Sequence, residues 1–125
     1  MTNLEKYLAI RDLVNATEKR ALVYGASFSE FVILRGIEAG GPQGIRRVDL
    51  AEQVSLSVSG ITRALAPLEK LGYIEHQEEE LDARVRKVVL TKSGRELFKD
   101  IEKDVQRLMD GIDQDLAEVA KLLKK

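Results

Sequence analysis

Residues 55–74 read SLSVSGITRALAPLEKLGYI, and this stretch decides the fold. It begins with small polar residues, continues with apolar residues at helical spacing, and ends in a glycine followed by an aromatic residue. Ser57 is a preferred helix N-cap, so we expect a helix over about residues 58–71, with Gly72 ending it. The side chains expected to face the core are Ile61, Leu65 and Leu68.

A shorter helix precedes this one. Arg46 and Arg47 are followed by VDLAEQV, which predicts about two helical turns, and Ser55-Leu56 is the expected turn between the two helices. The glycine-rich stretch GGPQG at 40–44 predicts a loop before the short helix. Two helices joined by a tight turn indicate a helix-turn-helix.

The period of the sequence changes after Gly72. Residues 73–77 and 86–90 are rich in strand-forming residues, and a loop is expected near 78–85, which predicts an antiparallel hairpin. The order of short helix, turn, helix and hairpin indicates a winged helix-turn-helix. The fold class is therefore mostly α with a small antiparallel β-wing.

Helical patterns flank this lobe, which we place at residues 44–95. A helix is expected over residues 3–24, ended by Gly25, and another begins at Ser27, where Glu30 completes a capping box. Thr91 or Ser93 caps a last helical region that Gly111 breaks or bends. We treat residues 1–125 as one domain and expect 3–24 and 96–125 to be dimerisation helices, because their apolar residues exceed what one small core covers. The alternative is a monomer that folds these helices back on itself.

The charge totals do not exclude a nucleic-acid partner. The chain has 20 basic and 21 acidic side chains, a formal net charge of −1. Residues 44–95 contain nine Lys/Arg and eight Asp/Glu, whereas residues 96–125 contain six and eight. The acidic excess thus lies outside the predicted lobe, and the distribution of charge matters more than its sum.

The composition also bounds the other classes of protein. There is no cysteine, which excludes disulfides, thiolate metal sites and thiol redox sensing. The sequence has neither a signal-peptide pattern nor an apolar run long enough to span a bilayer, so we expect a cytoplasmic protein. His76 is the single histidine, and no catalytic or nucleotide-binding motif occurs. We expect no enzymatic activity, no cofactor and no metal.

The start of the second helix carries the residue types that DNA reading needs. In a winged helix-turn-helix the first residues of this helix meet base edges in the major groove, so they must be short, polar and exposed. The residues that we expect to contact DNA there are Ser57, Val58, Ser59, Gly60, Thr62 and Arg63. The alternative is that Ser57 is only an N-cap and that Ser59 and Thr62 are only solvent-exposed.

A family resemblance extends this interpretation. LAEQVSLSVSGITRALAPLEKLGYIEH, followed by LDARVRKVVLTKSG, resembles the MarR family of bacterial transcription regulators over about residues 25–100. In that family the arginine matching Arg84 reaches from the wing into the minor groove, and the aspartate matching Asp82 helps to hold it. The alternative is an ordinary Asp–Arg pair on a solvated hairpin. The basic stripe expected on the DNA face is Arg46, Arg47, Arg63, Arg84, Arg86, Lys87 and Lys92.

The resemblance implies a homodimeric repressor that binds a palindromic double-stranded DNA operator with sequence specificity. It also implies that a small-molecule effector, often an aromatic acid, releases the DNA. The expected walls of the effector pocket are Tyr7, Tyr24, Phe28 and Phe31, with plain core packing as the alternative.

Two features depart from the family pattern. Pro67 interrupts the predicted reading helix and is expected to bend it locally. Glu78-Glu79-Glu80 places acidic residues in the wing, where they would oppose a phosphate backbone. This acidic wing keeps open a second function, a winged-helix protein-interaction module without DNA binding. A small-molecule binder without a DNA role is a third alternative.

Overall fold

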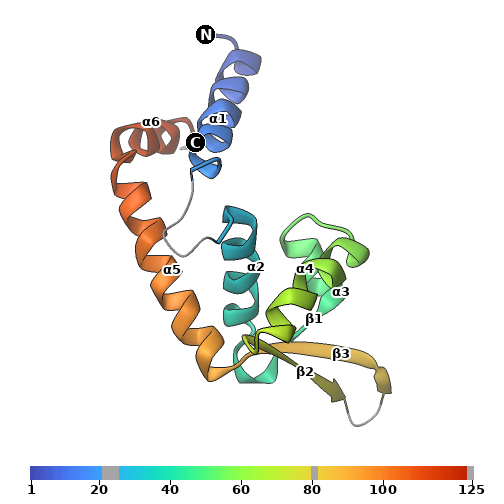
Figure 1. Cartoon of the computed structure of the whole chain (residues 1–125). Helices are drawn as coiled ribbons and strands as arrows, with labels where there is room; N and C mark the ends of the chain where they lie inside the picture. Colours follow the sequence, from blue (N-terminus) through green and yellow to red (C-terminus); the bar gives the residue numbers. More distant parts are fainter. Residues whose placement is uncertain (21–25, 80–81, 124–125) are drawn as a thin grey trace. The chain divides into compact units, whose positions relative to one another are not determined.

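The structure is a computed structural model that describes residues 1–20, 26–79 and 82–123, with the backbone alone at 78, 79 and 82–85. The described residues form helices and one small antiparallel sheet (Figure 1). They divide into two compact units, one from Met1–Phe28 and Ile101–Lys125 and the other from Ser29–Asp100.

The unit Ser29–Asp100 contains the helix-turn-helix and the wing. Its elements in chain order are α2 (Phe28–Ala39), the 3-10 helix η1 (Gly41–Gln43), β1 (Ile45–Arg46), α3 (Arg47–Gln53), α4 (Val58–Lys70), β2 (Ile74–Glu79), β3 (Asp82–Leu90) and the start of α5 (Lys92–Asp110). The fold is a mostly α winged helix, as expected from the sequence.

Helix α4 forms where the sequence predicts it. Its N-cap Ser57 accepts a hydrogen bond from the Gly60 amide at 3.0 Å, and Gly72 follows the helix with a φ of +81°. In the turn before it, Ser55 adopts a φ of +57°, which lets Leu56 donate back to the carbonyl of Ala51. The helix runs through Pro67 to Lys70.

The core of this unit collects apolar side chains from its α-helices and its three strands. Ile61, Leu65 and Leu68 of α4 are buried, as expected. They join α2, α3 and the sheet through fully buried side chains of Leu34, Ile37, Leu50, Ile74 and Val88. Phe31 and Phe98 stack with ring centroids 5.8 Å apart and an interplanar angle of 11°. Burial of this apolar area is the main force that holds the unit together.

The sheet differs from the predicted hairpin in two ways. It has a third strand, β1, which pairs with β3 and places Ile45 opposite Val88, so the strand order is β1-β3-β2. Two residues are too few to show an alternating pattern, so the sequence could not reveal β1. Arg46 therefore belongs to a strand, and Arg47 is the first residue of α3.

The loop predicted near residues 78–85 was too long, because both strands extend into that range. β2 continues to Glu79 and β3 begins at Asp82, with Glu78 in register with Arg86 and a shift between Glu78 and Glu79. Acidic residues are depleted in strands, but cross-strand pairing overrides that weak preference.

The terminal unit consists of α1 (Asn3–Glu18), the second half of α5, and α6 (Asp113–Leu123). The break expected at Gly111 is confirmed, since α5 ends at Asp110. The helix predicted over 3–24 was too long, because α1 ends at Glu18. There the Thr17 hydroxyl donates to the Leu13 carbonyl at 2.7 Å, and a tighter turn from Arg20 to Thr17 closes the helix. The predicted stop at Gly25 lies outside the described residues.

The start of α5 is joined to the end of α4 by hydrogen bonds. Thr91 caps α5 by accepting from the Gly94 amide at 3.1 Å, as one of the two predicted caps. The Thr91 and Ser93 hydroxyls also donate to the carbonyl of Gly72, at 2.6 and 3.0 Å. Gly94 is buried here, and a Cβ at this position would overlap the backbone carbonyl of Tyr73.

We expect Gly94→Ala to lower the free energy of unfolding by about 3 kcal/mol, because backbone atoms of Tyr73 would have to move. The matched control is Gly72→Ala, which has open space around its Cβ but a φ of +81°, and should cost only about 1 kcal/mol. Urea denaturation of both variants measures the difference. Equal losses would show that the α4–α5 junction tolerates displacement.

Candidate nucleic-acid interface

The first turns of α4 present a polar, solvent-exposed surface. Ser59, Thr62 and Arg63 are exposed, and Val58 beside them is 48% exposed. The Ser57 hydroxyl oxygen accepts a hydrogen bond from the Gly60 amide. Ser57 is therefore at least an N-cap, which was the alternative to a DNA contact. Because the opposite side of α4 is buried, these side chains project from a rigid element.

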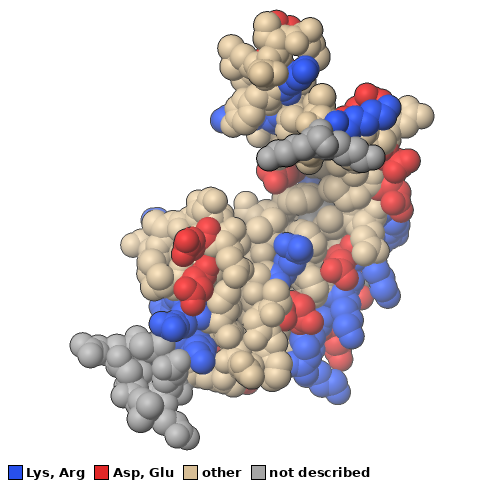
Figure 2. Space-filling view, turned by 180° about the vertical axis from the view of Figure 1, so that it is seen from behind, with Lys and Arg blue, Asp and Glu red and all other residues tan. Residues whose placement is uncertain are grey.

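Basic side chains gather beside the base of the wing, at the lower left of Figure 2, below a group of acidic ones. Among the basic residues predicted for the DNA face, Arg46, Arg86 and Lys92 are exposed, and Lys87 is half-buried. Arg86 and Lys87 are adjacent in β3 and therefore point to opposite faces of the sheet. Along α5 acidic and basic side chains are interspersed (Figure 2).

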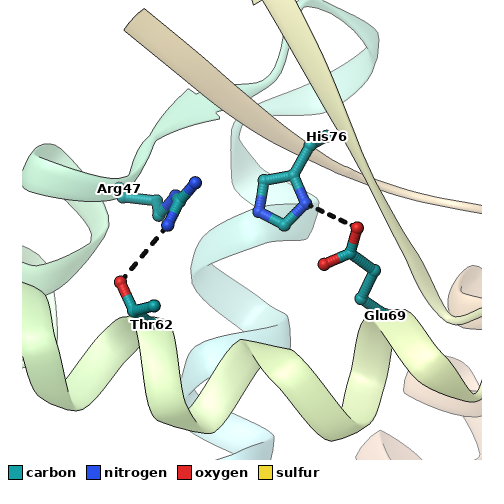
Figure 3. Close-up of polar contacts among 4 residues, drawn as sticks. All are labelled: Arg47, Thr62, Glu69 and His76. Atoms are coloured by element: carbon teal, nitrogen blue, oxygen red, sulfur yellow. Dashed lines mark hydrogen bonds and ion pairs between the residues drawn. The ribbon is translucent and has the colours of Figure 1, made fainter. Parts of the chain in front are cut away.

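Two arginines at the start of α3 differ in what they contact. Arg47 donates from Nη1 to the Thr62 hydroxyl at 3.3 Å, which joins α3 to the exposed side of α4 (Figure 3). Arg46 lies with Nε 3.8 Å from Oδ2 of Asp49, an exposed pair of little energetic value. Arg47 is thus held in place, whereas Arg46 stays a surface cation.

The structure brings several of these residues together with four that were not predicted as DNA contacts. Arg47, Thr62 and Arg86 line a hollow of about 200 Å³, and the rest of its wall is Leu65, Ala66, Glu69 and His76. His76 is half-buried, with Nδ1 3.2 Å from Oε1 of Glu69 (Figure 3). The signal for it was its spacing, since His76 lies two residues after buried Ile74 and so on the same face of the strand.

The wing tip and the predicted effector pocket are described only in part. The side chains of Asp82 and Arg84 lie outside the described residues, as does Tyr24. Tyr7 is 60% exposed on α1, Phe28 is half-buried, and Phe31 is buried against Phe98 in the other unit. The role of these residues in effector binding stays a prediction.

Within the described ranges, no group of three or more His, Cys, Asp or Glu side chains is placed to hold a metal ion. None of the helices in the described part of the chain combines the length and apolar character that a membrane crossing requires.

Comparison with known proteins finds a likeness to one family. The model of the MarR family matches residues 27–85, which include the helix-turn-helix and reach into the wing. This chain is similar to the MarR family over that span, which is just under half of its length. The HTH-type transcriptional regulator SarZ of Staphylococcus epidermidis is 27% identical over 108 residues, which are 86% of this chain and 66% of SarZ. The chain thus spans just under two thirds of the length of SarZ.

Solved structures share the MarR fold over nearly the whole chain. The S. aureus MepR–DNA complex has a TM-score of 0.76 at 18% identity, covering 98% of this chain and 97% of MepR. PcaV of Streptomyces coelicolor, solved with its natural ligand, has a TM-score of 0.75 at 15% identity, covering 98% of this chain and 89% of PcaV. At these identities the likeness shows a common winged-helix fold.

We expect Ser57→Ala to lower the free energy of unfolding by about 1 kcal/mol, because the Gly60 amide at the start of α4 loses its acceptor. Ser59→Ala, at an exposed residue two positions after Ser57, should leave the free energy of unfolding nearly unchanged. Thermal denaturation of both variants measures this. Equal melting temperatures would rule out the cap as a source of stability.

Proposed function

We propose that this protein is a transcription regulator that binds double-stranded DNA with sequence specificity. The observation that carries the proposal is the exposed set Ser59, Thr62 and Arg63 on the first turns of α4, with Arg47 and Arg86 beside it. In the winged-helix arrangement these turns enter the major groove, while cations around them contact phosphates. The match to the MarR family model and the name of SarZ support this proposal.

We assign the contacts by their chemistry. Arg63 is the base reader, since a guanidinium can bond a guanine edge bidentately. Ser57, Val58, Ser59, Gly60 and Thr62 provide a close approach to bases and phosphates. Asp82 and Arg84 act at the minor groove, where negative potential is concentrated. Phosphate contacts are assigned to Arg46, Arg47, Arg86, Lys87 and Lys92.

We propose that the protein acts as a homodimer. In the terminal unit, α1 and α6 leave many large apolar side chains exposed, namely Leu4, Tyr7, Leu8, Val14, Leu116, Leu122 and Leu123. An apolar surface of this extent on a soluble protein marks an interface. A second copy would cover it with the same side chains, and a two-fold dimer presents two α4 helices to a palindrome.

A small-molecule effector is the proposed release signal for a repressor working in the cytoplasm. PcaV was solved with its natural ligand, which supports an effector site in this fold. Tyr7, Tyr24, Phe28 and Phe31 are its proposed walls. An effector can release DNA only if it binds one dimer shape more tightly than another.

A protein-interaction module without DNA binding is the second candidate. Glu78-Glu79-Glu80 in the wing and the net charge of −1 favour it. The two candidates differ in their response to salt, because a DNA reader loses affinity in proportion to the phosphates that it neutralises.

Selection from a random duplex library at low salt, followed by sequencing of the bound fraction, tests the proposal. We expect enrichment of a palindrome with half-sites about ten base pairs apart, the spacing of one DNA turn. Sedimentation of the protein should show a dimer. A library from which no duplex is retained would favour the protein-interaction module instead.

Arg63→Ala should relax sequence preference more than it lowers non-specific affinity, because a base contact and not a phosphate contact is lost. The preference at one position of the operator should weaken by about 1–3 kcal/mol. Binding to the selected operator and to a scrambled duplex measures both effects. A uniform loss on both duplexes would assign Arg63 to the phosphate backbone.

A further inference from the structure

The hollow of about 200 Å³ lies between α3, α4 and the base of the wing. Thr62, Leu65, Ala66 and Glu69 form one stripe of α4 along its wall. The sheet contributes His76 and Arg86 from the face that carries buried Ile74 and Val88, because residues two apart and residues in register share a face. Arg47 of α3 supplies the third side.

His76 lies in this hollow with Nδ1 3.2 Å from Oε1 of Glu69, within ion-pair range. Both ring nitrogens are buried, and neither forms a hydrogen bond among the described residues. Figure 3 shows Nε2 on the side of Arg47 and Thr62, away from Glu69. A buried polar atom without a partner is costly, which favours a ligand that accepts from it.

We propose that this hollow is an oxyanion site that binds a phosphate group between Arg47, Arg86 and the Thr62 hydroxyl. Glu69 is a positioning residue that orients His76, and His76 donates from Nε2 to the same anion. The volume of about 200 Å³ accommodates a tetrahedral oxyanion with water around it, since one water occupies about 30 Å³ of liquid.

The charges around the hollow favour an anion. Glu69 from α4 faces Nδ1 of His76, while Arg47 from α3 and Arg86 from β3 line the same hollow. Two guanidiniums therefore oppose one carboxylate, and the lining carries a net positive charge.

The anion has two possible sources. A DNA backbone phosphate is the first, and that assignment rests on the proposed function. Free phosphate is the second, and it would bind the same donors with no duplex present. The two are separated by testing the site once with DNA and once without it.

The DNA arm measures operator affinity against salt concentration for wild type, Arg47→Gln and Arg86→Gln. Each phosphate contact contributes about 0.9 to the slope of log affinity against log salt, so each variant should lower the slope by about that amount per protomer. Arg35→Gln is the matched control, because Arg35 is exposed on α2, does not line the hollow, and loses the same charge.

The arm without DNA uses the imidazole protons of His76 as a reporter, which is unambiguous because the chain has one histidine. Titration of wild type with inorganic phosphate, against sodium chloride at matched ionic strength, should shift the His76 resonances. The shift should be lost in Arg47→Gln and kept in Arg35→Gln. Circular dichroism confirms that each variant is folded.

Two further variants test the roles of His76 and Glu69. His76→Gln should weaken operator binding, because the donor at Nε2 is lost. Glu69→Gln should bind the operator at least as tightly as wild type, because a carboxylate near the phosphate is gone, but should alter the phosphate-induced shift of the His76 resonances, because Glu69 orients the ring. A merely structural pair would leave the operator affinity and the resonance shift of the folded variants like those of wild type.

The outcomes assign the source of the anion or overturn the site. A lower slope in the arginine variants, with or without the resonance shift, assigns it to DNA. A shift with an unchanged slope, or with no duplex binding by wild type, assigns it to free phosphate, and the latter also refutes the proposed function. No shift together with an unchanged slope overturns the site.

Discussion

The two-sided character of α4 is the constraint on which the rest of the structure depends. Ile61, Leu65 and Leu68 must be buried against α3 and the wing, and this burial fixes which residues remain outside. Ser59, Thr62 and Arg63 are exposed because they lie between the buried positions in the helical period. The same packing that stabilises the unit therefore decides which side chains can reach a nucleic acid.

Polar contacts refine what the apolar packing sets up. The Ser57 cap defines the first turn of α4, and the Thr91 and Ser93 hydroxyls bind the Gly72 carbonyl just after its end. Between the two ends, Arg47 contacts Thr62 and His76 contacts Glu69, so α3 and β2 are each tied to a different turn of α4. These ties are individually modest, but each one limits the freedom of a side chain in the candidate interface.

The charges of the chain are separated in a way that a net value of −1 conceals. Basic side chains gather at the base of the wing, whereas α5 carries both signs interspersed (Figure 2). In the terminal unit the exposed side chains of α1 and α6 include a large apolar set, which a helix-turn-helix does not need for reading DNA. The surface of the unit Ser29–Asp100 is therefore suited to an anionic partner, and that of the terminal unit to an apolar one.

The sequence by itself determined the winged-helix order, the span of α4, its cap and buried face, and the exposed residues at its start. These features are local, because they depend on helical period, capping chemistry and turn residues within a few positions of each other. Its errors were also local, since the extent of the hairpin and the end of α1 depend on weak preferences that pairing and side-chain hydrogen bonds override. Only the tertiary structure decided that β1 adds a third strand and that Arg47, Thr62, Glu69, His76 and Arg86 surround one hollow. Those residues come from four elements, and their meeting depends on strand register and helix packing, which no spacing along the chain encodes.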